Sequence, residues 1–339
     1  MRYLITGASG FIGGHVAEAC RTRGHDVCAF VRPTSDVAFL EQIGASLVRG
    51  QFGDKETDDR ALADADVVVH CAAKVGDRGP ADEYRKVNVE ALQRFLDSCV
   101  RRHQVRPLHR FIHMSSLGVY EARHHYGTDE TEPLPDRHMD GYTQSKVEAD
   151  KLVLDYIKAG KLPIVILRPG FVYGPRDRAV LPRIIQRMTR GKIHFLGADK
   201  RLQNTIYVGN LVDAVFLAAE NPKAVGQIYN LTDGERITKE HFFNTIASEM
   251  GLPTSKQILP RWLAAIIVAL IHRHIRRFTA KGKDPWISPA QFKFLQLNLD
   301  FSIEKAKREL GYQPAVGFDE GMKKTISWYK ESFAASEPR

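Results

Sequence analysis

The sequence predicts an α/β fold, a doubly wound parallel sheet followed by a smaller C-terminal domain. Short apolar runs alternate with helical stretches over residues 1–190, which is the rhythm of parallel βαβ units. A glycine-rich turn, TGASGFIG at residues 6–13, follows the first apolar run and precedes the first helical stretch. A strand, a glycine turn and a helix in this order are typical of a Rossmann-type sheet.

The predicted elements follow one another along the chain. Strands are predicted at residues 3–5, 27–31, 46–48, 67–70, 111–114 and 164–167, where apolar residues form short runs. Helices are predicted at residues 11–23, 57–64, 81–103, 141–159 and 179–190. The stretch from Arg123 to Met139 is rich in His, Asp, Glu and Pro, so we expect an exposed loop, with His124 and His125 in solvent.

The glycines of the first turn suit a dinucleotide. Glycine permits a tight turn and a close approach of the ligand to the backbone. The free N–H groups at the start of the next helix would face the pyrophosphate. The spacing here is G-x-x-G-x-x-G. We therefore expect the cofactor to contact Gly7, Ser9, Gly10, Phe11, Ile12 and Gly13.

The end of the second predicted strand indicates which dinucleotide binds. Arg32 stands 19 residues after Gly13, where an NAD-binding protein would carry an acidic residue for the ribose hydroxyls. A guanidinium suits phosphate oxygens, and Thr34 and Ser35 add hydroxyl donors beside it. A solvated arginine at a strand end is the alternative, but no carboxylate occupies the position. The sequence therefore favours NADP over NAD.

Tyr142 and Lys146 lie four residues apart in GYTQSKVEAD, within a predicted helix. Positions i and i+4 share one helix face, so the phenol and the ammonium should project into the same space. A phenol titrates near 10 on its own, and we expect the lysine cation to lower that pKa toward the range of acid–base catalysis. Ser115 and Ser116 end the upstream run FIHMSS, where a hydroxyl would hold the substrate oxygen. The Tyr-x-x-x-Lys pair alone is also common on helix surfaces; its combination with the serines and the glycine turn favours catalysis.

Together these segments resemble the extended short-chain dehydrogenase/reductases, which include nucleotide-sugar epimerases, sugar dehydratases, 3β-hydroxysteroid dehydrogenases and dihydroflavonol-type reductases. The resemblance extends from residue 1 to about residue 330. Further matching segments are VVVHCAA (67–73), VNVEAL (87–92), FIHMSSLGVY (111–120), YTQSK (142–146), LRPGFVYGPRD (167–177), IYVGNLVDA (206–214) and ELGYQP (309–314). The resemblance implies an NADP-binding domain at 1–190, to which 206–220 return, and a substrate domain formed mainly by 191–330.

The same resemblance implies roles for individual residues. Ser116, Tyr142 and Lys146 would be catalytic, and Lys146 would also hold the nicotinamide ribose. Further cofactor contacts would come from Arg32, Ser35, Gln51, Phe52, His70, Ala72, Ala73, Lys74, Asn88, Ser115, Tyr142, Pro169, Gly170 and Val172. Asn88 would tie a helix to the sheet beneath the cofactor. Gln51 replaces the Asp that the family often has there, but an amide can still hydrogen-bond adenine.

Within the resemblance, three residue tests separate the possible reactions. Leu117 and Gly118 follow Ser116 where sugar dehydratases carry Asp-Glu, which disfavours dehydration. Gly170 and Gln203 stand where nucleotide-sugar enzymes usually have Asn and a phosphate-binding Arg, which disfavours a UDP-sugar, although other arginines lie nearby in the sequence.

We therefore expect an NADP-dependent oxidoreductase that interconverts a hydroxyl and a ketone on an apolar, sterol- or polyketide-like substrate. This places the chain nearest the 3β-hydroxysteroid dehydrogenase and dihydroflavonol-reductase side of the family. A nucleotide-sugar epimerase is the first alternative. A non-catalytic NADP-binding regulatory protein is the second.

Composition restricts the partners. The net charge of +9 suggests anionic partners such as NADP, acyl-CoA or a lipid surface, and no nucleic-acid motif is present. Four cysteines without C-x-x-C spacing predict reduced thiols in a cytoplasmic protein, and no metal-ligand spacing occurs. Met1 leads directly into the first strand, so no signal peptide is expected. A homodimer is left open.

The apolar run WLAAIIVALI at residues 262–271 is too short to cross a bilayer, which needs about 20 residues. A basic run follows at 272–283, so the segment is either a buried helix of the substrate domain or a helix that touches a membrane surface. In the first case we expect the apolar side chains of Trp262, Leu263, Ile266, Ile267 and Leu270, with Phe292, Phe294, Leu295 and Leu297, to enclose an apolar substrate cavity over the nicotinamide.

Overall fold

Seven parallel strands form the main sheet, in the spatial order β10-β7-β5-β4-β1-β2-β3. The structure is a computed structural model that describes residues 1–76, 79–138, 140–190, 200–253 and 289–334, with positions 266, 270 and 273. The strands are β1 Arg2–Thr6, β2 Asp26–Val31, β3 Ser46–Arg49, β4 Val67–His70, β5 Arg110–Met114, β7 Ile164–Pro169 and β10 Ile228–Leu231. The strand order reverses between β1 and β4, and dinucleotides bind beyond the carboxyl ends of the strands at such a point.

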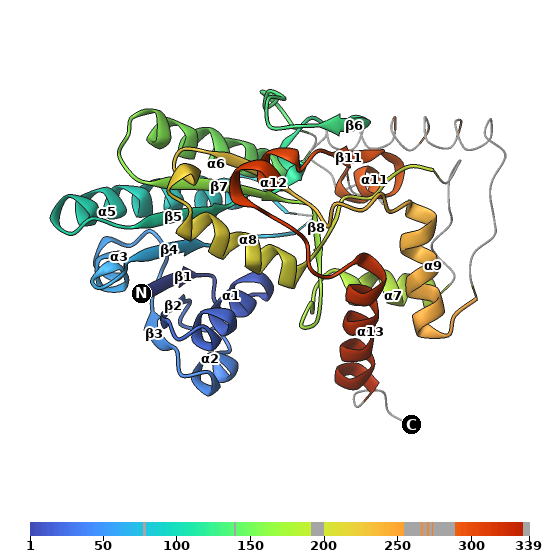
Figure 1. The fold of residues 1–339 in the computed structure, drawn as a ribbon, viewed down its shortest axis with the longest axis horizontal. Coiled ribbons are helices and arrows are strands. Elements are labelled where there is room, and N and C mark those ends of the chain that lie inside the picture. Colours follow the sequence, from blue (N-terminus) through green and yellow to red (C-terminus); the bar gives the residue numbers. More distant parts are fainter. Residues whose placement is uncertain are drawn as a thin grey trace.

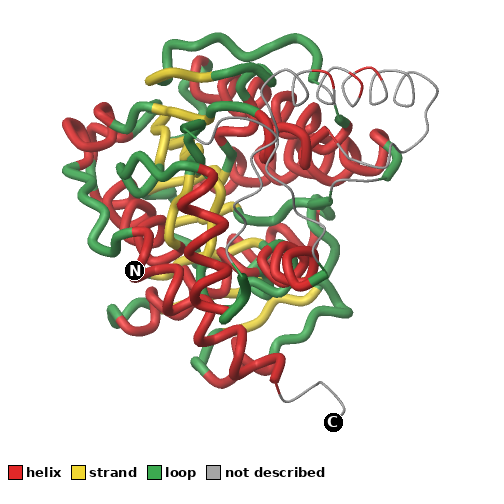
Figure 2. The backbone as a smooth tube through the Cα atoms, turned by 90° about the vertical axis from the view of Figure 1, so that its right-hand side faces the viewer, coloured by secondary structure: helices red, strands yellow, loops and turns green. Residues whose placement is uncertain are grey.

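Helices cover both faces of this sheet (Figures 1 and 2). One face packs against α1 (Phe11–Thr22), α2 (Ala38–Gln42), α8 (Val208–Glu220) and α12 (Glu304–Leu310). The other packs against α3 (Lys55–Leu62), α5 (Ala91–Val105) and α6 (Gly141–Lys158). Because both faces are covered, the strands are mostly apolar; Val67, Val68 and Val69 of β4 are all buried.

Smaller elements lie beyond the carboxyl ends of the strands. Strand β6 (His125–Thr128) pairs with β11 (Leu299–Phe301), and β8 (Phe171–Tyr173) pairs with β9 (Thr205–Tyr207). The helices there are α7 (Leu181–Thr189), α9 (Lys239–Met250), α11 (Pro289–Gln296) and α13 (Phe318–Ala334). Helices α7, α9 and α13 share an apolar core. Short helices occur at α4 (Ala81–Arg85), η1 (Lys86–Glu90), η2 (Leu117–Val119) and η3 (Pro222–Ala224).

The predicted α/β fold with a parallel Rossmann-type sheet is confirmed. Each predicted strand and helix is present with ends shifted by a few residues at most, except that the helix predicted at 81–103 is divided by the π-helical turn η1. Residues beyond 190 also belong to the main sheet, because α8 and α12 cover it and β10 is its edge strand. The domain boundaries stay a prediction.

The exposed loop predicted at 123–139 is wrong in part. Residues 125–128 form β6, and His125 is 1% exposed. Its ring lies 4.4 Å from that of Phe301, and its backbone N–H donates to the carbonyl of Asn298. The partner strand is some 170 residues away in the chain, so the local sequence gave no sign of the pairing.

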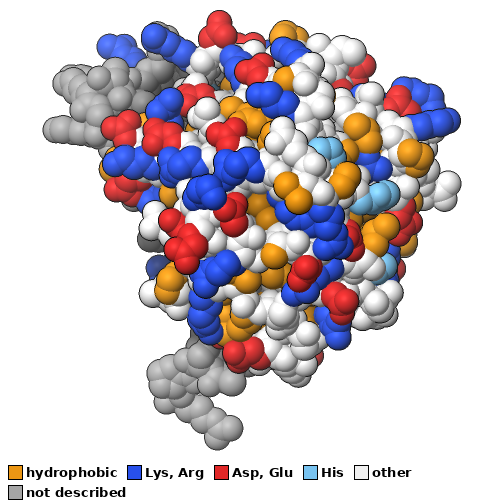
Figure 3. Space-filling model, turned by 90° about the vertical axis from the view of Figure 1, so that its left-hand side faces the viewer, with side chains coloured by type: hydrophobic (Ala, Val, Ile, Leu, Met, Phe, Trp, Pro, Cys, Tyr) orange, Lys and Arg blue, Asp and Glu red, His pale blue; other side chains and the backbone are white. Residues whose placement is uncertain are grey.

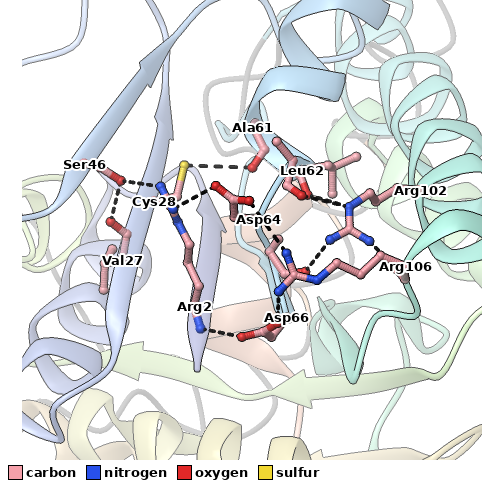
Figure 4. A network of polar contacts seen from close by, with 12 residues as sticks. Arg2, Val27, Cys28, Ser46, Ala61, Leu62, Asp64, Asp66, Arg102 and Arg106 are labelled. Carbon is pink, nitrogen blue, oxygen red and sulfur yellow. Dashed lines mark hydrogen bonds and ion pairs between the residues drawn. The ribbon is translucent and has the colours of Figure 1, made fainter.

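The amino-terminal edge of the sheet is closed by a polar network (Figure 4). The Arg2 guanidinium pairs with Asp64 at 3.0 Å, and the Arg2 backbone N–H donates to Asp66 at 2.9 Å. Arg106, just after α5, pairs with the same Asp66 at 3.0 Å, while Arg102 donates to the carbonyl of Leu62 at 3.0 Å. This network ties β1 to α3 and α5 at the edge opposite the glycine turn.

Among the described residues, no helix is long and apolar enough to cross a membrane. The basic run at 272–283 lies outside the described residues apart from position 273. Of the five apolar positions predicted between 262 and 270, only Ile266 and Leu270 are described; their side chains are 49% and 60% exposed. On the face seen in Figure 3, Lys and Arg side chains are interspersed with Asp and Glu rather than gathered in one patch.

Candidate active site

The glycine turn after β1 is built so closely that side chains are excluded. Gly7 has a φ of +68°, and a Cβ there would lie 2.8 Å from the backbone N of Ala72. A Cβ on Gly13 would lie 2.4 Å from the carbonyl oxygen of Gly7. Helix α1 begins at Phe11 without a side-chain cap, so its first N–H groups can bind an anion. The turn therefore fits the pyrophosphate of a dinucleotide.

Two polar groups lie near the end of β2, where the adenosine ribose would be expected. The side chain of Arg32 is exposed, and its carbonyl accepts the backbone N–H of Ser35 at 3.0 Å. The hydroxyl of Ser35 is buried and has no hydrogen-bond partner within the described part of the chain. A buried hydroxyl without a partner is costly, and a phosphate oxygen would satisfy it.

Asn88, in the π-helical turn η1, connects two parts of the site. Its side chain accepts the backbone N–H of Lys74 at 2.7 Å and donates to the carbonyl of Lys74 at 3.0 Å. It also donates to the hydroxyl of Ser145 on α6 at 2.9 Å. Asn88 thus fixes the loop after β4 to the helix that carries Tyr142 and Lys146.

Of the other residues predicted to contact the cofactor, Gln51 is exposed and Ala72 and Ala73 lie in the loop after β4. The Thr6 hydroxyl accepts the N–H of Ala72 at 3.2 Å and bonds the Nδ1 of His70 at 2.8 Å. The His70 ring is 3% exposed and stacks on Phe52 at 5.1 Å. His70 and Phe52 therefore belong to the core beneath the turn, and their contact with the cofactor stays a prediction.

Helix α6 brings Tyr142 and Lys146 to the carboxyl end of β5. The helix is capped by Asp140, whose carboxylate accepts the backbone N–H of Thr143 at 2.8 Å. The ammonium of Lys146 donates to the carbonyl of Met114, the last residue of β5, at 2.8 Å. Ser115 and Ser116 come directly after Met114, so Lys146 lies at the strand end that carries the predicted serines. Tyr142 lies one turn before Lys146 on α6, with its ring 5.9 Å from that of Tyr84.

The hydroxyl of Ser116 is already engaged on one side. Its Oγ accepts the backbone N–H of Gly118 at 3.0 Å, in the short helix η2. Because that bond uses a lone pair, the hydroxyl hydrogen remains able to donate to a substrate oxygen. Ser115 is more deeply buried, at 5% exposed, and its hydroxyl has no hydrogen-bond partner among the described residues.

The pKa of Tyr142 departs from the sequence-based expectation. Burial of the phenol, together with the nearby Asp140 carboxylate and Tyr84, raises its pKa to about 12. Lys146 does not lower it, because its ammonium faces the carbonyl of Met114. Burial also lowers the pKa of Lys146, against the opposing effect of the Asp150 carboxylate. In this structure Tyr142 is therefore a neutral phenol, a proton donor rather than a base.

Beneath the site lies a buried polar row that the sequence analysis missed. Arg168 of β7 donates to Asp150 of α6 at 2.9 Å and to the hydroxyl of Tyr120 at 2.8 Å. Tyr120 in turn donates to Asn230 of β10 at 2.9 Å, and His113 of β5 lies 3.6 Å from Asp150. A signal was present: Asp150 follows Lys146 by four residues on the buried face of α6, and Arg168 interrupts an apolar strand.

The substrate side of the site is closed by β8 and by helices from the C-terminal part. A Cβ on Gly170 would lie 2.1 Å from the carbonyl oxygen of Asn204, so only glycine fits there. The ring of Phe171 lies 5.0 Å from that of Phe294 on α11. The neighbouring Lys293 donates to the carbonyl of Gly118 at 3.0 Å, a contact that the sequence analysis also missed. Among the predicted cavity residues, Leu297 is buried and Phe292 has no described side chain.

Comparison with known proteins identifies the family to which the chain belongs. The model of the NAD dependent epimerase/dehydratase family matches residues 3–232. The chain belongs to this family. It is 29% identical over 333 residues to the 2-alkyl-3-oxoalkanoate reductase of Shewanella oneidensis, which covers 95% of this chain and 84% of the reductase. It is 30% identical over 356 residues to the decarboxylating sterol-4-alpha-carboxylate 3-dehydrogenase of Candida albicans, with 97% of each chain covered.

Among solved structures, this epimerase/dehydratase family member resembles the UDP-glucose 4-epimerase of Thermotoga maritima, solved with UDP-glucose. The TM-score is 0.75 and the sequence identity is 22%, and the match covers 98% of this chain and 100% of that chain. That likeness shows a shared fold. The chain is an NAD(P)-dependent oxidoreductase of the extended short-chain dehydrogenase/reductase type. Among the described residues, no cluster of His, Cys, Asp and Glu could hold a metal ion, and all four cysteines are free thiols.

Proposed function

We propose that this protein uses NADPH to reduce a ketone on an apolar substrate to a hydroxyl group, with Ser116, Tyr142 and Lys146 as catalytic residues. One observation carries the proposal: Lys146 of α6 donates to the carbonyl of Met114, the residue directly before Ser115 and Ser116, and Tyr142 precedes Lys146 by one turn on the same helix. The relatives named above support the substrate class, since their names describe a reductase of oxoalkanoates and a dehydrogenase of sterol carboxylates.

In the reduction Tyr142 would act as the proton donor. A phenol with a pKa of about 12 is fully protonated at neutral pH and can give its proton to the ketone oxygen. Ser116 would hold the same oxygen through its free hydroxyl hydrogen while its Oγ accepts from Gly118. When bound, the nicotinamide supplies the hydride that completes the reduction. Lys146 would then return toward the phenolate and stabilise it.

Arg32 and Ser35 support the choice of NADPH. An exposed guanidinium and a buried hydroxyl without a described partner lie close together where the 2′-phosphate of NADP would be. Arginine suits phosphate because its planar donors match two oxygens at once. The carboxylate that would bind the NAD ribose hydroxyls is missing from this position in the sequence.

A nucleotide-sugar epimerase is the second candidate, and two contacts speak against it. Gln203, at the position of the family's diphosphate-binding arginine, is 3% exposed and accepts from Lys239 at 2.6 Å, so it is engaged in the core. The close approach of Asn204 to Gly170 leaves no room for the Asn side chain that these enzymes carry there. Arg176 is also engaged, with Glu18 at 2.6 Å.

The test is turnover by the purified protein. It would be incubated with NADPH and a panel of long-chain and cyclic ketones, with the Tyr142→Phe variant as the control, and any cofactor that co-purifies would be identified. We expect net oxidation of NADPH by the native protein and none by the variant. Tightly held cofactor without net oxidation, together with conversion of a UDP-sugar, would favour the epimerase. The absence of both activities would favour a regulatory protein.

A further inference from the structure

The half-buried Lys293 of α11 contacts the short helix that follows Ser116. Its ammonium donates to the carbonyl of Gly118 at 3.0 Å and lies 3.1 Å from the Nε2 of His138. Gly118 is also the residue whose N–H binds the hydroxyl of Ser116. Lys293 therefore contacts the same three-residue helix, η2, that orients the proposed substrate-binding serine.

The charge of Lys293 is offset only in part, by the Asp140 carboxylate, which raises the pKa of the ammonium against the larger effect of burial. Among the described residues, no carboxylate lies within 4.0 Å of its ammonium. The nearest acid is that of Asp140, which caps α6 through Thr143 and lies 3.8 Å from the ring of His138. Burial lowers the pKa of Lys293 to about 8, so the group still carries most of its charge at neutral pH. Among the described residues, its hydrogen-bond partners are the carbonyl of Gly118 and the ring of His138, so the ammonium can still form a charge-assisted hydrogen bond to an anion from outside the protein.

Helix α11 is held so that Lys293 keeps this position. The carbonyls at its C-terminal end accept hydrogen bonds from two cations, Phe294 from Lys239 and Gln296 from Arg201. Cations at a helix C-terminus are favourable, since the last carbonyls otherwise lack partners. The next residue, Phe294, packs on Phe171 at the apolar wall. Consecutive helix residues point to different sides, so α11 directs Lys293 toward η2 and Phe294 into the apolar core with Phe171 and Phe242.

We propose that Lys293 binds the carboxylate of the substrate, which is a 3-oxo acid or the corresponding 3-hydroxy acid with an apolar chain. This rests on the proposed function, because the acid must lie near the ketone that Ser116 and Tyr142 handle. In a 3-oxo acid the carboxyl carbon is only two bonds from the reacting carbon, which matches a cation that shares η2 with Ser116. The phosphates of an acyl-CoA are much farther from the reacting carbon and do not fit this place.

A matched pair of substrates tests the proposal. A long-chain 3-hydroxy acid and its methyl ester would be oxidised with NADP, and kcat/KM measured for each. We expect the native protein to prefer the acid by at least about tenfold. Lys293→Gln keeps a donor for the carbonyl of Gly118 but removes the charge, so it should lower kcat/KM for the acid by about 10- to 100-fold more than kcat/KM for the ester. Lys293→Arg should keep part of the preference.

Lys55→Met, at an exposed lysine on α3, is the control and should change neither value. Melting curves would check that each variant folds, and Lys293→Met would replace the glutamine variant if that one does not. Equal kcat/KM for acid and ester in the native protein, or an unchanged ratio in Lys293→Gln, would overturn the proposal while leaving the ketone reductase intact. If neither substrate turns over, the proposed function fails. Calorimetry would then test the carboxylate site separately, by comparing the affinity of the acid for the native protein and for Lys293→Gln. Equal affinities would overturn the carboxylate site.

Discussion

The carboxylate of Asp150 and the guanidinium of Arg168 form an ion pair at 2.9 Å in which both side chains are almost completely buried, at 0% and 2% exposed. Asp150 lies one turn after Lys146 on α6, and Arg168 lies on β7, so the pair joins the catalytic helix to the sheet. The guanidinium also bonds Tyr120, which bonds Asn230. The position of α6, and with it Tyr142 and Lys146, therefore depends on a charge pair that does not itself reach the substrate.

Removing one charge of this pair should be costly. Asp150→Asn leaves Arg168 buried without its counter-ion, and we expect a loss of about 3–5 kcal/mol in the free energy of unfolding. Asp59→Asn is the matched control, because it breaks an exposed pair with Lys55 and should cost less than about 1 kcal/mol. Denaturant unfolding measures both. A loss below 1 kcal/mol for Asp150→Asn would mean that the pair does not hold the helix.

The same pair predicts an acid dependence. Burial alone would raise the pKa of Asp150, but Arg168 and His113 outweigh it and lower the pKa to about 2. Because the folded-state pKa lies below the unfolded one near 4, the contribution to stability is complete above pH 4 and is lost as the pH falls toward 2. Unfolding curves between pH 5 and 2 should therefore fall less steeply for Asp150→Asn than for the native protein. Parallel curves would contradict this.

Cofactor preference should depend on Arg32. We expect NADPH to bind more tightly than NADH, and Arg32→Asp to reverse the preference by at least about tenfold, since hydrogen bonds to charged groups contribute about 1.5–3 kcal/mol. Calorimetry with both dinucleotides is the measurement, and Arg49→Asp, at an exposed arginine on the adjacent strand β3, is the control. Equal affinities of the native protein for the two dinucleotides would refute the assignment.

Catalysis should depend on the three residues at the end of β5 in different ways. Tyr142→Phe should abolish turnover but leave NADPH binding nearly unchanged, because the phenol gives a proton and does not anchor the cofactor. Lys146→Ala should weaken both. Ser116→Ala should lower kcat by about 10²- to 10⁴-fold, the range for a positioned acid–base group. Native activity in Tyr142→Phe would require another proton donor.

The pH dependence of acid substrates should follow Lys293. The groups that act on its ammonium are His138, Asp140 and His125, and burial keeps the pKa of His138 at about 4, so His138 does not change charge near pH 8. Lys293 itself loses its proton as the pH rises through about 8. We expect KM for a 3-hydroxy acid to rise above pH 8 while KM for its methyl ester stays constant. A common pH profile for both would show that another group is responsible.

The sequence by itself determined the βαβ rhythm, the glycine turn and the placement of Tyr142 and Lys146 on one helix face, because local periodicity and fixed i, i+4 spacing decide these features. It did not reveal the pairing of β6 with β11, the buried row through Arg168, or Lys293, because each joins residues far apart in the chain. It also gave the wrong direction for the pKa of Tyr142, since burial and the hydrogen bond from Lys146 to Met114 exist only once α6 is packed on the sheet. The spacing of residues along a helix decides which side chains can meet. Their charge states depend on burial and on long-range contacts, and only the tertiary structure decides burial and long-range contacts.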